Sequence, residues 1–158
     1  MVRQSEVELF ESCWRQLDYN HATGILFWRK DKTNAGWKDI DGRIHIRLSG
    51  NLYLAHRLVF LMFNNYLPEL VDHKDQDPSN NLVANLRDAT KQVNAINTGL
   101  PSNNKSGIKG VSWHKAGSKW TAQIKHDGRK IHLGSYDSLL DATEARLKAE
   151  EELWSDLR

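Results

Sequence analysis

Hydrophobic residues recur at helical spacing near the start of the chain and alternate with polar residues further on. Val7, Phe10 and Cys13 fall on one face of a helix, which predicts an amphipathic first helix. Residues 43–48 alternate strictly between polar and apolar side chains, which is typical of a half-buried strand. Two further apolar runs predict partner strands: residues 25–29 and 52–54.

The polar side of the alternating run carries Arg43, His45 and Arg47. These side chains either touch phosphates or simply face solvent, and the pattern leaves both interpretations open. The next apolar run, residues 56–64, is dense enough to predict a helix that lies in the core.

A short motif of two strands and a helix is predicted after this core helix. The strands are expected at residues 70–73 and 85–88, and the helix at residues 91–97. Thr90 stands where an N-cap residue belongs, because its hydroxyl can accept a hydrogen bond from an amide of the first turn.

The character of the chain changes after residue 98, where Gly, Pro, Ser and Asn are frequent. Three strands are predicted beyond it, at residues 110–114, 119–125 and 130–133, and a helix follows from Ser138. Side-chain alternation assigns these residues to the face covered by the helix: Val111, Trp113, Trp120, Ala122, Ile124, Ile131 and Leu133.

These elements predict an α+β protein in three parts. Residues 1–98 should form a small mixed domain that contains the two-strand and helix motif at about 70–97. Residues 99–106 should be a linker. Residues 107–158 should form a three-stranded antiparallel sheet packed on one C-terminal helix.

The formal net charge of the chain is only +2, so the distribution of charged residues says more about function than the total. Residues 103–134 hold seven lysines and arginines and one acid, whereas residues 135–158 hold seven acids and three bases. A basic sheet backed by an acidic helix would turn one face toward polyanions. The single cysteine excludes an intrachain disulfide. Because no membrane-length apolar run or signal peptide is visible, we expect a cytoplasmic protein that does not bind membranes.

The best candidates for chemistry lie in the predicted motif. An imidazole, His73, can take a proton from water at cellular pH. The adjacent Asp72 offers a hard oxygen ligand for Mg²⁺. Asn94 and Asn97 are three residues apart and share one face of the predicted helix. This order suits a hairpin that packs onto a helix and holds one divalent metal.

At these residues the sequence resembles the HNH endonucleases, specifically the phage-type homing branch with its ββα-metal core. Leu54 to Val59, Val71-Asp72-His73, Asn85-Leu86-Arg87 and Asn94 to Asn97 carry the resemblance. It implies that His73 is the general base, that Asn85 orients it, and that Asp72 and Asn94 bind the metal. Oxygen ligands favour Mg²⁺ or Mn²⁺ over Zn²⁺.

Three further residues are candidates for supporting roles near this site: His56, Asp75 and Asn97. Arg57 precedes the core helix and could contact DNA. For His56 a hydrogen-bonded structural histidine is an equally natural reading, and Asp75 could be a solvated loop acid.

The second half resembles the APETALA-type (ethylene-response-factor) DNA-binding domain. The match lies in Gly110 to Trp113, Lys119 to Ile124, Leu133 to Tyr136 and the alanine-bearing helix. In that family the sheet lies in the major groove. The resemblance implies these DNA-contacting residues: Lys109, Ser112, His114, Lys119, Gln123, Lys125, Lys130 and His132.

Taken together, the leading hypothesis is a metal-dependent endonuclease that hydrolyses double-stranded DNA, by nicking or by cutting both strands. We expect a monomer or a weak dimer, encoded by a phage and acting in the host cell. The alternative is a sequence-specific DNA-binding protein with an inactive nuclease half. A third hypothesis, an RNA-binding or protein-interaction module, rests only on positive charge.

Overall fold

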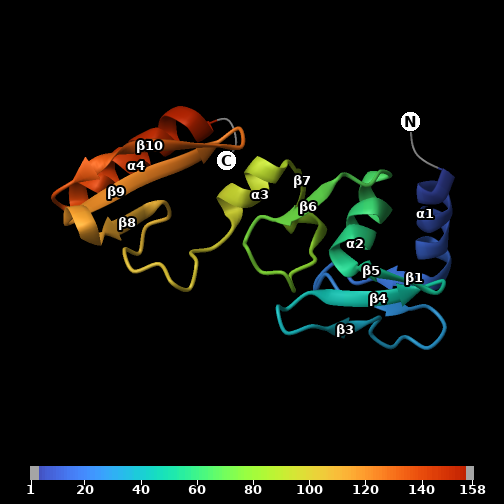
Figure 1. The fold of residues 1–158 in the computed structure, drawn as a ribbon. Coiled ribbons are helices and arrows are strands. Elements are labelled where there is room, and N and C mark those ends of the chain that lie inside the picture. The colour runs from blue at the N-terminus through green and yellow to red at the C-terminus, as the bar shows by residue number, and fades with distance from the viewer. Residues whose placement is uncertain (1–3, 156–158) are drawn as a thin grey trace. The chain divides into compact units, whose positions relative to one another are not determined.

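The computed structural model describes residues 4–155 and divides the chain into two compact units, residues 1–94 and 95–158. Helices and small antiparallel sheets occur in both, so the predicted α+β class is confirmed (Figure 1). The division falls inside a helix, whereas the sequence predicts a linker at 99–106. The domain bounds therefore stay a prediction, and their outermost residues, 1–3 and 156–158, lie outside the described part.

The first unit is built from two helices beside small sheets and a hairpin that leads into a third helix. In Figure 1 α1 and α2 lie side by side. Its elements are α1 (Gln4–Gln16), β1 (Leu17–Tyr19), β2 (Leu26–Trp28), β3 (Trp37–Lys38), β4 (Ile44–Leu48), β5 (Asn51–Leu54), α2 (Ala55–Asn64), β6 (Leu70–His73), a 3₁₀ turn (Val83–Asn85), β7 (Leu86–Ala89) and α3 (Lys91–Asn97).

The core of this unit forms where α2 meets the apolar side of β4. Leu58 and Val59 of α2 are buried together with Ile46 and Leu48, the inward residues of the alternating run. Cys13 is also fully buried in this cluster. The predicted core helix is therefore confirmed, and its packing supports the hairpin that follows it.

The hairpin of β6 and β7 is antiparallel, with Asp72 opposite Arg87 and His73 opposite Leu86. The Thr90 hydroxyl accepts a hydrogen bond from the amide of Val93 at 3.1 Å, which confirms the predicted N-cap of α3. Two strands and a helix thus follow one another in the predicted order.

The second unit is a three-stranded antiparallel sheet, in the order β10-β9-β8, packed on one helix. Val111, Ala122 and Ile124 are buried on its covered face, and Ala142 and Ala149 of the helix pack there too. Small alanines let helix and sheet approach closely. The elements are β8 (Val111–His114), a 3₁₀ turn (Lys115–Gly117), β9 (Lys119–His126), β10 (Arg129–Tyr136) and α4 (Leu139–Trp154).

Two residues assigned to the covered face are exposed, although each pairs directly with a residue that packs in the core. Trp113 is 46% exposed and Ile131 is 38% exposed. Trp113 lies opposite Trp120 in the sheet, with their ring centroids 5.2 Å apart, and Trp120 is the one that packs against the core. Alternation fixes the face of a strand, but burial requires that another element cover that part of the face.

Arg146 occupies a place in this core that the sequence did not indicate. Its side chain is 2% exposed, and its Nη1 atom lies 2.8 Å from Oε1 of Glu150. The guanidinium carbon, Cζ, lies 4.5 Å from the ring centroid of Trp154. A buried charge needs its counter-charge, because desolvation costs several kcal/mol per ion. Arg146 and Glu150 both belong to α4, so the pair lies within one helix, one turn apart.

We predict that Glu150→Ala lowers the free energy of unfolding by about 3–5 kcal/mol, because it removes the carboxylate that pairs with the buried Arg146 charge. Replacement of both partners by apolar residues should cost much less. The matched control is Glu152→Ala, which removes an exposed pair with Lys148 at 4.0 Å and the same spacing; it should change stability by less than about 1 kcal/mol. Urea unfolding measures all three, and equal losses at Glu150 and Glu152 would contradict the prediction.

Candidate functional site

Asp72 and His73 lie at the end of β6, and both are largely buried, at 7% and 9% exposure. Neighbours on a strand point to opposite faces, so the two side chains meet different partners. The hairpin register decides which partners these are.

Asp72 forms an ion pair with Arg87, its direct cross-strand neighbour. The Arg87 Nε and Nη2 atoms lie 3.0 and 2.9 Å from the same carboxylate oxygen, Oδ2. A guanidinium at this distance holds the carboxylate in one direction. Arg87 had no role in the sequence prediction, and only the strand register could have indicated one.

The His73 ring is held by Asn81 and packs against His56. The His73 Nε2 atom lies 3.0 Å from Asn81 Oδ1. An amide oxygen can only accept a hydrogen bond, so Nε2 is the donor in this contact. The His56 ring meets His73 edge to face, with the centroids 4.9 Å apart.

His56 is buried beneath this site, and its surroundings keep it neutral. Burial, then the charges of His73, Arg57 and Arg43, lower the pKa of His56 to about 3. It therefore cannot exchange protons near neutral pH. Its place against the His73 ring fits the supporting role expected for it, and also the structural alternative.

The hydrogen bonds of Asn85 go to the loop between the two strands, and its role in orienting His73 stays a prediction. Its side chain donates to Asp75 Oδ1 at 2.9 Å and to the Asn80 carbonyl at 2.8 Å, and its own carbonyl accepts from the Lys74 amide. Asn85 therefore shapes the loop between the two strands. The hydrogen bond to the ring comes from Asn81, which had no role in the sequence prediction.

Asp75 organises the same loop. Burial alone would raise its pKa, but hydrogen bonds from the Asp77 amide and from the Asn80 and Asn85 side chains outweigh burial, so the pKa of Asp75 is lowered. The carboxylate accepts from Asn80 Nδ2 at 2.7 Å. Asp75 thus stabilises the conformation of the loop that contains Asn81.

Asn94 lies on the exposed side of α3, and Asn97 ends the same helix. Within residues 4–155 no group of three His, Cys, Asp or Glu side chains is placed to hold a metal ion. One carboxylate and one amide oxygen would nevertheless fit Mg²⁺, which usually keeps several waters and adds oxygens of a bound phosphate. Asp72 and Asn94 as its ligands stay a prediction.

Arg57 is engaged by the protein itself rather than presented freely to solvent. Its two terminal nitrogens each lie 3.1 Å from a main-chain carbonyl, of Glu69 and of Pro68. Burial lowers the pKa of Arg57. The guanidinium fixes the connection between α2 and β6, and therefore the start of the strand that carries Asp72 and His73.

In the second unit, most of the predicted DNA-contacting residues lie along the three strands. Lys125, Lys130 and His132 are exposed on the uncovered face. Ser112 contacts the Thr121 hydroxyl at 3.2 Å, and Lys119 pairs with Asp137 at 3.0 Å.

Two members of the predicted set have structural contacts of their own. His114 accepts a hydrogen bond from the Gly117 amide through Nδ1 at 3.3 Å. Lys109 precedes β8, and its contact with DNA stays a prediction. Its ammonium donates to the carbonyls of Ala95, Ile96 and Thr98, so all three protons are used at the end of α3.

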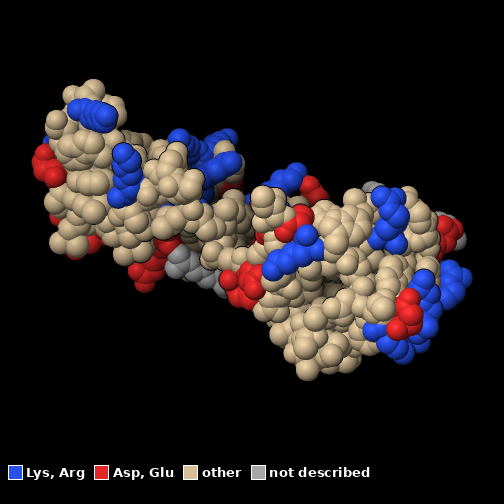
Figure 2. Space-filling view, turned by 90° about the horizontal axis from the view of Figure 1, so that it is seen from below, with Lys and Arg blue, Asp and Glu red and all other residues tan. Residues whose placement is uncertain are grey.

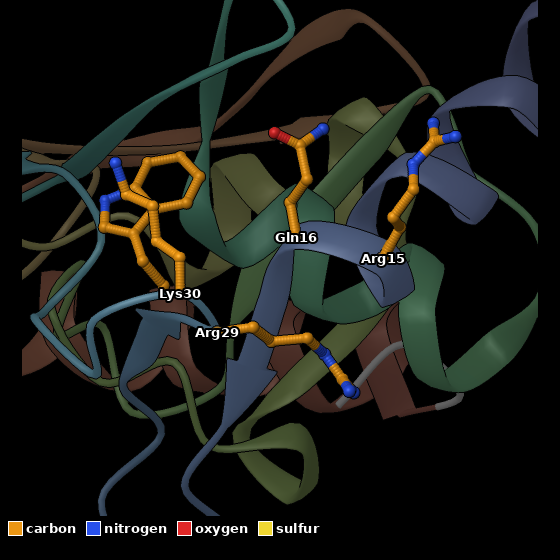
Figure 3. Close-up of a pocket in the computed structure, with 5 residues that line it drawn as sticks. Arg15, Gln16, Arg29 and Lys30 are labelled. Atoms are coloured by element: carbon orange, nitrogen blue, oxygen red, sulfur yellow. The ribbon is translucent and has the colours of Figure 1, made fainter.

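A separate basic hollow of about 510 Å³ lies on the first unit, between α1 and the end of β2 (Figure 3). Arg15 and Lys30 line it together with Gln16, Trp28 and Arg29, whose guanidinium lies 2.9 Å from Asp18. On the face seen in Figure 2, lysines and arginines lie in separate groups with acidic side chains between them. Basic residues therefore gather in separate small groups on each unit rather than over one continuous surface.

None of the helices within residues 4–155 combines the length and apolar composition of a membrane span.

Comparison with known proteins agrees with the geometry of the hairpin. A family described as HNH endonuclease matches residues 53–96. A chain from a structure described as "DNA binding and cleavage by the HNH homing endonuclease I-HmuI" aligns with 90% of this chain and 86% of its own length, at 25% identity and a TM-score of 0.43.

"Protein 3.8" of Escherichia phage T7 is 34% identical over 86 residues, which are 53% of this chain and 71% of that protein. The matched HNH residues span β5 to α3 and include the hairpin with Asp72 and His73. The chain thus contains an HNH endonuclease domain and belongs to the same family as Protein 3.8 of phage T7.

Proposed function

We propose that this protein is a divalent-metal-dependent endonuclease that hydrolyses phosphodiester bonds of double-stranded DNA. The observation that carries the proposal is the oriented imidazole of His73 next to Asp72, which pairs with Arg87, within the residues that match the HNH family. The phage origin of the relative supports action on DNA in an infected host cell.

In the proposed reaction His73 is the general base. Its Nδ1 takes a proton from a water molecule, and the water oxygen attacks the scissile phosphorus in line. The bond between phosphorus and the 3′-oxygen breaks, and the 3′-oxygen takes a proton from solvent. The products carry 5′-phosphate and 3′-hydroxyl ends. Asn81 supports this step because its amide oxygen keeps the other proton on Nε2.

Asp72 and Asn94 would hold the metal, with Mg²⁺ or Mn²⁺ as the natural choice for oxygen ligands. When bound, such an ion stabilises the negative charge that develops on the phosphate and the leaving oxygen. Arg87 contributes by holding the Asp72 carboxylate in one direction.

The second unit would bind the DNA that the first unit cuts. The resemblance to the APETALA-type domain supports a role for its uncovered sheet face. The proposed contacts are Ser112, His114, Lys119, Gln123, Lys125, Lys130 and His132. Lysines and amides suit phosphate oxygens and base edges respectively. In the first unit, Arg57 would act by positioning β6 rather than by direct contact.

A DNA-binding protein with an inactive nuclease half is the second candidate. The low exposure of Asp72 and His73 favours it, because a scissile phosphate must reach both side chains. The intact HNH hairpin favours cleavage. The first experiment below separates the two.

His73→Ala should lower the rate of plasmid cleavage roughly 10²–10⁴-fold, since this is the typical contribution of a general base, while DNA affinity stays the same. EDTA should stop the wild-type reaction and added Mg²⁺ should restore it. Gel-based nicking and a filter-binding assay measure the two quantities.

The control for that substitution is His45→Ala, which removes an imidazole paired with Asp39 at 2.7 Å on another sheet of the same unit. It should leave the cleavage rate unchanged. Cleavage by His73→Ala at the wild-type rate would remove His73 as the base, and a wild-type protein that binds but never cuts would favour the second candidate.

Replacing both Lys125 and Lys130 by Gln should reduce the salt dependence of DNA binding. Each phosphate contact contributes about 0.9 to the slope of log K against log salt concentration, so the slope should fall by about 1.8. Lys148→Gln on α4 is the control, because α4 covers the opposite face of the sheet. An unchanged slope in the double variant would exclude this face from the phosphate contacts.

The neutral state of His56 predicts a dependence of stability on pH. In the unfolded chain His56 should titrate near 6.5, whereas in the fold its pKa is about 3. The unfolded state therefore binds more protons between these values, and stability falls as pH falls through that window. Relative to a His56→Leu variant, the wild type should lose up to about 3 kcal/mol between pH 7 and pH 4. Urea unfolding at several pH values measures this, and parallel curves would contradict it.

A further inference from the structure

The hydroxyl of Tyr19, on β1, bridges two main-chain groups of the segment that carries Asn81. It donates to the Asn81 carbonyl at 3.1 Å and accepts from the Val83 amide at 3.0 Å. Burial raises the pKa of Tyr19, so the hydroxyl keeps the proton that it donates. The ring is fixed separately, by packing on Phe63 with the centroids 4.9 Å apart.

The turn between β1 and β2 touches the same peptide group. Gly24 adopts a φ of +74°, and a Cβ atom there would lie 2.6 Å from the Leu82 nitrogen and 2.7 Å from the Asn81 carbonyl carbon. No side chain fits in that space. The Asn20 carbonyl accepts the Gly24 amide at 2.8 Å and holds the turn in this shape.

Asn81 is therefore held from two directions. Tyr19 and Gly24 fix its main chain from the β1–β2 hairpin, while Asn85 and Asp75 fix the neighbouring Asn80 from the loop side. Its side chain is left with one orientation toward His73 Nε2. A small displacement of Asn81 would lengthen that hydrogen bond and release the ring.

We propose that Tyr19 is a positioning residue for His73, acting through the main chain of Asn81, with Gly24 as its steric counterpart. The inference rests on the proposed function, because it assumes that His73 is the general base. Neither Tyr19 nor Gly24 lies among residues 53–96, so the β1–β2 hairpin would belong to the catalytic apparatus although it lies outside the matched family region.

Tyr19→Phe tests this directly, because it removes the bridging hydroxyl and keeps the ring that packs on Phe63. The kcat for DNA cleavage should fall roughly 10- to 100-fold, as expected when a reacting group is misplaced, with KM unchanged. Tyr66→Phe is the matched control. It removes a hydroxyl that contacts Asp88 at 3.1 Å on the surface of the same unit, and it should leave kcat unchanged.

Nitrogen NMR of the His73 ring provides a readout that needs no activity. The wild type should show the proton on Nε2, whereas Tyr19→Phe should show a mixture of both tautomers. Gly24→Ala, which pushes on the same peptide from the other side, should give the same mixture. Tyr66→Phe should keep the wild-type spectrum.

The outcomes separate the two proposals. Wild-type kcat in Tyr19→Phe, or a slower variant with an unchanged His73 tautomer, would overturn the positioning role. A wild-type protein that does not cleave DNA would overturn the proposed function instead, and the NMR comparison would still decide whether Tyr19 positions the ring.

Discussion

The hydrogen bond between His73 Nε2 and Asn81 Oδ1 is the contact on which the candidate site depends. Because an amide oxygen only accepts, Nε2 is the donor in this bond. Tyr19, Asn80 and Asp75 then serve to keep Asn81 in place. A group of polar side chains thus holds the residue that contacts the His73 ring.

The β6–β7 hairpin also brings a counter-charge to the buried Asp72 carboxylate. An ionised carboxylate with little exposure to water is costly, and the register places Arg87 directly opposite Asp72 to compensate. The same register turns His73 toward the loop. One strand pairing therefore fixes both Asp72 and His73, and the buried α2 supports that pairing.

In the second unit, burial is confined to one face of the sheet. Its covered face is packed with alanines and a few larger residues, and the buried Arg146 is balanced by Glu150. With apolar burial confined to one face, lysines on the other remain free to face solvent. Lys109, although basic, stabilises the end of α3, so its ammonium is engaged by the protein itself.

Local pattern by itself determined the elements. The period of apolar residues predicted the core helix and the alternating strand, and Thr90 predicted the start of α3, because these signals act within a few residues. The sequence could also point to Asp72 and His73, since the family motif is contiguous there. Tertiary structure alone decided that Asn81 contacts the His73 ring, that Arg87 compensates Asp72, that Trp113 is exposed and that Arg146 is buried. Each of these depends on strand register or on what covers a face, and contacts between distant segments leave no local signal in the chain.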